Sequence, residues 1–146
     1  MGRRRRVPSS LITLVALSLG AAAVPSPAQR LVVVTECDRL AAHGQDPERA
    51  APGVDAATLA AQAGQAVAAC QQAVAQYPDT GRLRFQLGRA LWVAGKRDES
   101  LAEMRRAVEA GSSAAAGWLG ARHTDGTLGK ADFSEAARLF RIAAEK

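Results

Sequence analysis

The stretch from Leu87 to Gly111, LGRALWVAGKRDESLAEMRRAVEAG, decides the fold because its apolar residues recur at helical spacing. This stretch and the turn before it hold two apolar stripes: Leu83, Leu87, Ala90, Leu91 and Ala94, then Leu101, Met104, Ala107 and Val108. Each stripe predicts an amphipathic helix with one buried face. Gly95 stands between them and predicts a left-handed end for the first helix. Gly88 and Ala107 are small, so we expect two antiparallel helices to approach closely there.

The same spacing returns on both sides of this stretch, which indicates internal repeats. Leu119 and Gly120 repeat Leu87 and Gly88 after 32 residues. A second set returns after 36 residues, because the loop TDGTLGKAD carries an insertion of four: Glu135, Ala136, Phe140 and Ala143 match Glu99, Ser100, Met104 and Ala107. Upstream, a partial repeat stands 34 residues before its counterparts and comprises Ala66, Cys70 and Ala73. No single helix of this kind buries its stripe alone, so neighbouring helices must stack.

Residues 81–114 resemble the tetratricopeptide repeat through their Leu-Gly, Gly, Asp-Glu and Ala positions, with Arg84 and Ser100 as departures. Residues 112–146, with the longer Gly-rich loop, look like the related Sel-1-like repeat. The segment ECDRLAAHGQDPERAAPGV, followed by a helix containing AVAAC, is similar to secreted bacterial proteins that carry such repeats. The resemblance implies an all-α fold, a short α-α superhelix (solenoid) of antiparallel helix pairs.

The pattern predicts five main helices, at about 57–77, 82–94, 97–110, 113–123 and 133–145. We expect Asp79 or Thr80, Ser112 and Asp132 to cap helix starts, the last in a capping box with Glu135. The expected organisation is a signal peptide at 1–28, an irregular arm at 29–55 and a helical repeat domain at 56–146.

The N-terminus has the features of a signal peptide. Four arginines at 3–6 precede an apolar run at 11–24, and small residues allow cleavage after Ala28 or after Ala23. This predicts export across the inner membrane, most simply to the periplasm; the alternative is an uncleaved anchor, which would be the only membrane contact. The four arginines also explain most of the net charge of +5, because the other 15 basic residues nearly balance 14 acidic ones (15 − 14 = +1). With no basic stripe left, the sequence argues against nucleic-acid binding.

Cys37 and Cys70 are the only cysteines, and an even number in an exported chain predicts a disulfide. It would close a loop of 33 residues and contribute about 3–4 kcal/mol on the chain-entropy model. We expect it to tie the irregular arm to the first main helix as a cap. The alternative is two buried free thiols. A metal site is not predicted, because the two cysteines, His43 and His123 lack ligand spacing.

The sequence predicts no catalytic residue and no cofactor. GTLGK at 126–130 only faintly suggests a phosphate loop, since Ala131 stands where Ser or Thr is needed. The chain has no Gly-x-Ser-x-Gly or Ser-x-x-Lys motif. Asp98 and Glu99 suit a helix start better than an acid–base pair. Some secreted Sel-1-like proteins are described as β-lactamases, but their cysteines recur in every repeat and here none follows residue 81.

The resemblance places a binding surface on the first helix of each pair. The predicted partner-binding residues are Arg82, Phe85, Arg89, Trp92 and Val93. Trp and Arg often anchor interfaces, and the two arginines suit an acidic or C-terminal carboxylate group of a peptide. Small residues at Gly117, Ala121 and Thr124 would make this groove shallow in the second repeat. The alternative is that the arginines are solvated and Trp92 only covers helix ends.

The last helix, SEAARLFRIAAEK, raises a question of assembly. We expect Phe140 and Ala143 to point inward and Leu139 and Ile142 to point elsewhere. Because terminal repeats normally present a polar cap, an apolar outer face predicts a second copy, another protein or a further part of the chain on it. The predicted function is a secreted scaffold for protein–protein interaction without catalysis. The alternatives are an auxiliary or regulatory subunit of a cell-envelope enzyme, and a β-lactamase-like hydrolase.

Overall fold

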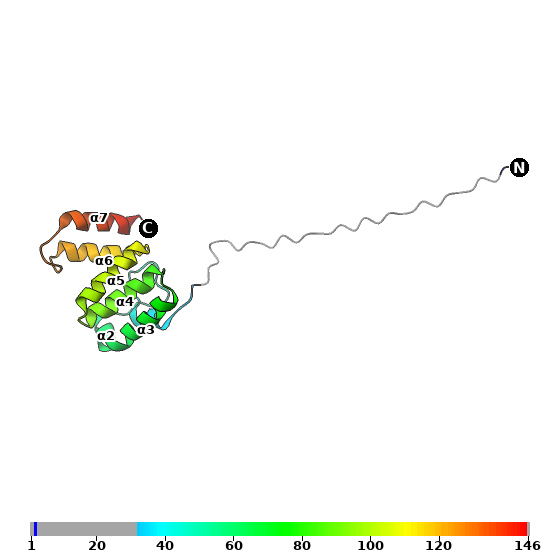
Figure 1. Cartoon of the computed structure of the whole chain (residues 1–146), viewed down its shortest axis with the longest axis horizontal. Coiled ribbons are helices and arrows are strands. Elements are labelled where there is room, and N and C mark those ends of the chain that lie inside the picture. The colour runs from blue at the N-terminus through cyan, green and yellow to red at the C-terminus, as the bar shows by residue number, and fades with distance from the viewer. Residues whose placement is uncertain (1, 3–31, 146) are drawn as a thin grey trace. The chain divides into compact units, whose positions relative to one another are not determined.

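The computed structural model describes Gly2 and residues 32–145, and this part of the chain is all-α, as predicted (Figure 1). It contains seven helices: α1 Glu36–Ala41, α2 Ala56–Ala61, α3 Ala63–Gln76, α4 Gly81–Val93, α5 Arg97–Glu109, α6 Ser113–Thr124 and α7 Phe133–Ala144. None of these described helices is long and apolar enough to cross a membrane. Apart from Gly2, the predicted signal peptide at 1–28, with both cleavage sites, lies outside the described residues.

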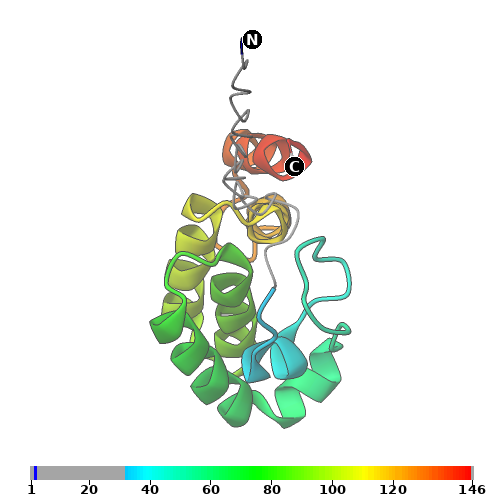
Figure 2. The same cartoon turned by 90° about the vertical axis from the view of Figure 1, so that its right-hand side faces the viewer.

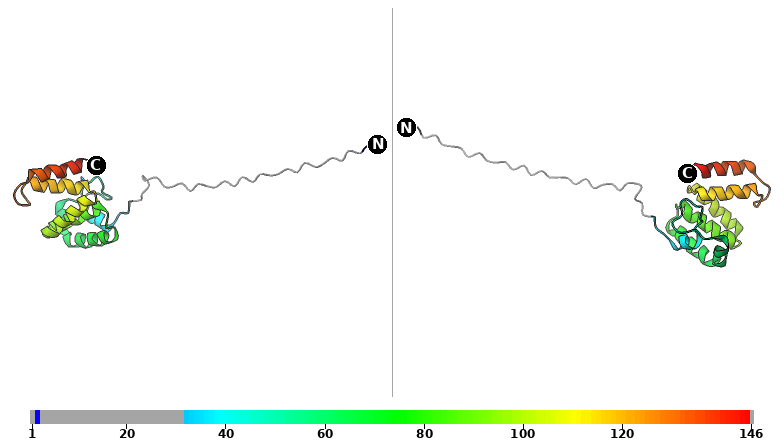
Figure 3. Two further views of the ribbon diagram at one scale, coloured as in Figure 1. Left: turned by 45° about the horizontal axis from the view of Figure 1, so that its top comes forward. Right: turned by 180° about the vertical axis from the view of Figure 1, so that it is seen from behind.

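Two antiparallel helix pairs, α4 with α5 and α6 with α7, make the most extensive contacts of the fold (Figures 1 and 3). In each pair the two helices approach closely at a glycine of the first helix, where a large side chain of the second helix packs. A Cβ atom added to Gly88 would lie 2.9 Å from Cε of Met104, and one added to Gly120 would lie 3.0 Å from the ring of Phe140. The close approach predicted at Gly88 is therefore confirmed, and the second pair uses the same device.

The predicted helix ends are confirmed in part. Gly95 follows α4 with a φ of 78°, which favours glycine. The Ser112 hydroxyl accepts a hydrogen bond from the Ala115 amide at 3.2 Å. Asp132 accepts one from the Glu135 amide at 3.0 Å, but the Glu135 carboxylate pairs with Arg138 instead of completing the capping box. Thr80 occupies the N-cap of α4 without any side-chain bond to it.

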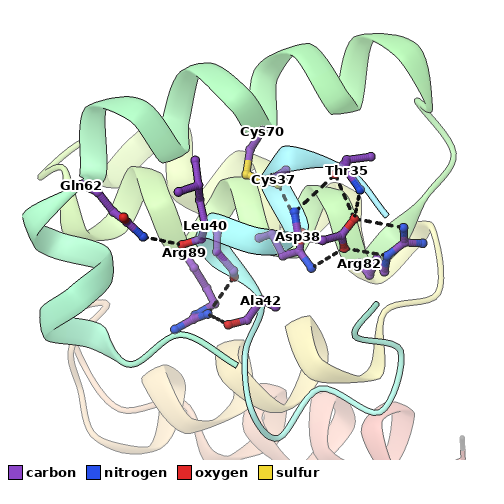
Figure 4. Close-up of a disulfide and its surroundings, with 11 residues drawn as sticks. Thr35, Cys37, Asp38, Leu40, Ala42, Gln62, Cys70, Arg82 and Arg89 are labelled. Carbon is purple, nitrogen blue, oxygen red and sulfur yellow. Dashed lines mark hydrogen bonds and ion pairs between the residues drawn. A yellow bond between two sulfur atoms is a disulfide. The ribbon is translucent and has the colours of Figure 1, made fainter. Parts of the chain in front are cut away.

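The single helix predicted at 57–77 is wrong, because the chain breaks it at Gln62 into α2 and α3. Gln62 leaves helical geometry with φ −121° and ψ 22°. Its side-chain amide donates a hydrogen bond to the Leu40 carbonyl at 3.2 Å (Figure 4). The break thus coincides with a contact to the N-terminal arm, which no local pattern in 57–77 encodes.

The arm, residues 32–55 in this part of the chain, contributes α1 to the core. In Figure 2 this short cyan helix lies on the inner side of α3 and α4, and it packs against both. The predicted disulfide is present: Cys37 of α1 is bonded to Cys70 of α3, and both residues are fully buried (Figure 4). A first apolar cluster around them joins α1, α2, α3 and α4, and a second cluster joins α4, α5, α6 and α7.

The predicted orientation of the last helix is wrong for Leu139. Leu139 is buried, at 2% exposure, and packs in the second cluster with Leu119. Ile142, also predicted to point elsewhere, is partly buried against the same cluster. Phe140 does lie over Gly120, as predicted for an inward residue, yet it stays 44% exposed. The reason is that α7 ends the described stack: α6 covers one side of it, and the opposite side has no described neighbour.

Candidate functional site

A groove runs between the loop of the arm and the helices α4 and α6. It consists of two adjoining hollows, of about 480 and 360 Å3, that share His43, Trp118 and Arg122. The first is further lined by Gln45, Pro47, Phe85, Ser113, Ala114, Gly117, Ala121 and Ala143. The second is further lined by Ala56, Leu59, Arg89, Trp92 and Val93. Two of the lining residues of the first hollow, Gly117 and Ala121, are therefore small.

One face of α4 holds the arm in place. Arg82 and Gln86, one turn apart, both donate to the Asp38 carboxylate at 3.0 Å, through Nε and Nε2 respectively (Figure 4). Asp38 also closes a capping box with Thr35 at the start of α1. Burial by itself raises the pKa of Asp38, but the hydrogen bonds from Arg82, Thr35 and Gln86 outweigh it and hold that pKa below its ordinary value.

The third contact on this face is Arg89, which is only 8% exposed. Its Nη1 donates to the carbonyls of Ala41 and Ala42, both at 2.8 Å (Figure 4). Its Nη2 donates to the Val54 carbonyl at 3.0 Å. Ala41 and Ala42 end α1, where unsatisfied carbonyls and the helix dipole favour a cation. Arg89 thus fixes both ends of the loop that forms one wall of the groove.

This loop, residues 43–53, is closed at its neck. The Val54 amide donates to the Ala42 carbonyl at 2.8 Å. Gly44 and Gly53 touch there, since a Cβ on Gly53 would lie 2.4 Å from Cα of Gly44. A side chain at Gly53 would therefore force the neck open. The groove wall is a closed loop fastened to α4.

The opposite wall carries tryptophans and arginines. Trp92 of α4 and Trp118 of α6 meet edge to face, with ring centroids 4.8 Å apart. The Arg97 guanidinium lies 4.1 Å from the Trp92 ring centre, and that of Arg122 lies 4.8 Å from Trp118. Cations over indole rings are attracted by the ring quadrupole. This attraction holds Arg122 in the groove wall and Arg97 against Trp92, although Arg97 itself lines neither hollow.

The five predicted partner-binding residues do not all reach this groove. Phe85 lines the first hollow, and Arg89, Trp92 and Val93 line the second. Arg82 lies away from both, paired with Asp38. Partner binding by these residues stays a prediction, but Arg82 and Arg89 already bond a carboxylate and carbonyls of the chain's own arm.

Sequence reasoning missed His43, Trp118 and Arg122, which both hollows share. Trp118 corresponds to Gln86 in the 32-residue repeat offset, a position that the tetratricopeptide pattern does not mark. His43 enters through the fold of the arm, its ring 6.0 Å from that of Phe85. The repeat pattern therefore gave no signal for Trp118, and nothing in the sequence placed the arm beside it.

Burial shifts the pKa values of two titratable side chains of the arm, His43 and Asp46. Burial lowers the pKa of His43, and the positive charge of Arg89 lowers it further, which favours the neutral imidazole. Burial raises the pKa of Asp46, whose Oδ1 accepts the Glu48 amide at 2.9 Å. Its Oδ2 is buried without a hydrogen-bond partner among the described residues.

The groove presents aromatic, polar and charged side chains. His43 and Ser113 both line the first hollow, yet no hydrogen bond between their side chains is found within residues 32–145, as a nucleophile and its base require. The described residues also contain no group of three or more His, Cys, Asp or Glu placed to hold a metal ion. The walls instead offer flat aromatic surface, small-residue hollows and guanidinium groups.

Comparison of the chain with protein-family models, curated proteins and solved structures finds no match.

Proposed function

We propose that this protein is a secreted scaffold for protein–protein interaction, and that its groove binds an extended segment of a partner polypeptide. The observation that carries the proposal is the meeting of Trp92, Trp118 and Arg122 in hollows bounded by the arm. Trp and Arg contribute most strongly to binding when they sit centrally in such hollows. Two adjoining hollows suit successive side chains of one segment.

The charge of the groove favours an acidic segment. Arg82 and Arg89 are occupied by the arm, so recognition of a carboxylate passes to Arg97 and Arg122. Within residues 32–145 the Arg97 guanidinium makes no ion pair or hydrogen bond, and its only described contact of this kind is the one with the Trp92 ring. Arg122 pairs only with the half-exposed Asp125, at 3.1 Å, an i,i+3 pair of little stability that a partner carboxylate can replace.

The proposal that the helices form a repeat solenoid rests on the equivalence of the two helix pairs, α4 with α5 and α6 with α7. Gly88 under Met104 and Gly120 under Phe140 have the same role at matching positions, as stacked repeats require. We take the two pairs, with α3 before them, as a short solenoid of the tetratricopeptide and Sel-1-like type.

The proposed location is the periplasm. It is supported by the signal-peptide pattern at 1–28 and by a buried disulfide, since structural disulfides persist in oxidising compartments. The partner is then another protein exported to the same compartment.

The test uses intrinsic fluorescence, because Trp92 and Trp118 are the only tryptophans of the chain. An arrayed library of peptides, with acidic and amidated neutral versions of each sequence, is titrated against the full chain. We expect acidic peptides to shift the emission and to bind at least ten times more weakly to Arg122→Glu, which loses about 1.4 kcal/mol or more. Trp118→Ala is expected to weaken binding as well.

The matched control is Arg105→Glu, the same charge change at an exposed position of α5 outside the groove. It should leave affinity within twofold. Equal losses in Arg105→Glu and Arg122→Glu would reduce the effect to net charge and refute the groove as the binding site.

A further inference from the structure

The outer side of α7 carries an apolar stripe that nothing in the described chain covers. Phe133 is 68% and Phe140 44% exposed, and Ala137 and Ala144 are exposed as well. These four residues follow each other at intervals of four, three and four, so they lie on one face of the helix. The face is separate from the groove, which α7 reaches only through Ala143.

The buried face of α7 points in a different direction. Ala136, Leu139 and Ala143 pack toward α6, about 100° around the helix from the centre of the stripe. Phe140 stands at the boundary, with one ring edge over Gly120 and the rest open. An exposed aromatic pair at helical spacing on one face of a helix is typical of an interaction surface.

We propose that this stripe pairs with the same stripe of a second copy, in an antiparallel arrangement about a two-fold axis. The stripe reads Phe, Ala, Phe, Ala along the chain, hence Ala, Phe, Ala, Phe in the opposite direction. When two such helices pair antiparallel, Phe133 meets Ala144 of the other copy, and Ala137 meets Phe140. Every large side chain then faces a small one, which is the self-complementarity that a two-fold interface requires. A parallel pairing would instead set Phe against Phe at both levels.

The size of the stripe makes this a weak dimer. A fully covered Phe buries roughly 150–250 Å2, and stable interfaces bury about 800 Å2 per partner. Two partly exposed phenylalanines and two alanines on a helix of 12 residues remain well below that area. We therefore expect the chain to be monomeric at about 10 μM and to form measurable dimer only near about 1 mM, where the association free energy is about −4 kcal/mol.

An arginine beside the stripe predicts how dimer formation depends on salt. Arg141 is exposed and lies beside the stripe, on the edge that the two copies share. Arg138 lies farther round and is already paired with Glu135 at 2.6 Å. The two Arg141 side chains repel each other across the dimer, so salt strengthens the association.

The test is sedimentation equilibrium of the full chain and three variants over this concentration range. Ala137→Phe adds apolar area but sets Phe against Phe140 of the other copy, and we expect the association constant to fall at least tenfold. Phe140→Ala removes the large partner and lowers it similarly. The double variant Ala137→Phe with Phe140→Ala restores a large-against-small pair and returns the constant to within threefold of the original chain.

Folding is checked by circular dichroism, because Phe140 also covers Gly120. Ala137→Phe changes an exposed position and keeps the test independent of that packing. All variants carry the same N-terminal segment, so differences between them report on α7. Arg105→Glu, away from the stripe, is the control and should leave the association unchanged.

Three results would overturn the proposal. A chain monomeric at all concentrations excludes a second copy, whatever other protein binds the stripe. Tighter association of Ala137→Phe would mean non-specific apolar contact, and a double variant as weak as Phe140→Ala would contradict the antiparallel register. None of these results bears on peptide binding in the groove.

Discussion

Arg89 shows how a single buried cation organises the arm. Its guanidinium donates to three carbonyls, two at the end of α1 and one at Val54. Arg89→Met keeps the apolar stem but leaves these carbonyls without that donor. We expect the free energy of unfolding to fall by about 2–4 kcal/mol in urea denaturation. Arg105→Met, at an exposed site, should change it by no more than about 0.5 kcal/mol. A loss below about 1 kcal/mol for Arg89→Met would show that the arm is held by packing alone.

Asp38 gives a pH-dependent prediction. Its pKa is lowered in the folded chain, so its contribution to stability is complete above the unfolded value of about 3.9 and is lost as the pH falls through the folded value. Asp38→Asn should therefore cost about 2–3 kcal/mol at pH 7 and progressively less below pH 4. Unfolding curves of both proteins from pH 7 to pH 2 check this. If the difference in unfolding free energy between the two proteins does not shrink in acid, the loss comes from altered packing at position 38 and not from the lost negative charge.

At the scale of elements, replacing a helical glycine by alanine should have opposite effects on stability at two positions, Gly88 and Gly64. Gly88→Ala adds a methyl group 2.9 Å from the fully buried Met104, and we expect it to destabilise the fold by about 1–3 kcal/mol. Gly64→Ala, in α3, meets nothing within 4 Å and should stabilise it by about 0.5–1 kcal/mol through helix propensity. Thermal and urea unfolding measure both. A stabilising Gly88→Ala would mean that the α4–α5 contact is loose.

Local periodicity was sufficient for the main helices, because each has an apolar stripe that its neighbours bury. It failed at Gln62, where a hydrogen bond to Leu40, 22 positions away, accompanies the break between α2 and α3. It also failed for Leu139, since the direction of α7 is set by how it packs on α6. Both errors arise from contacts between elements, which a single helical pattern does not contain.

At the scale of the whole molecule, the disulfide joins the arm to the helical stack. Replacing Cys37 and Cys70 together by Ala releases a loop closure of 33 residues and should cost about 3–4 kcal/mol. We expect faster amide hydrogen exchange throughout residues 36–56, including the loop that walls the groove, while α6 and α7 change little. Uniform acceleration over all helices would mean that the arm is needed for the entire fold.

The groove was predictable only in its α4 half. Trp92, Val93 and Phe85 follow from the resemblance to tetratricopeptide repeats, and they do line the hollows. The other wall depends on the arm folding back onto α4, through Asp38 with Arg82 and through Arg89 with the end of α1. Those pairs are more than 40 positions apart, so no spacing rule connects them. The arginines predicted for a partner were the ones that hold the arm.

The central claim is that a partner segment lies in the groove between the arm, α4 and α6. The most direct measurement is the NMR spectrum of the two indole Nε1–H groups, of Trp92 and Trp118, during titration with an acidic peptide selected by the fluorescence screen. The account predicts that both signals shift together and saturate with the peptide, and that Arg122→Glu strongly reduces the shifts at the same peptide concentration. A peptide that binds while both indole signals stay in place would contradict it.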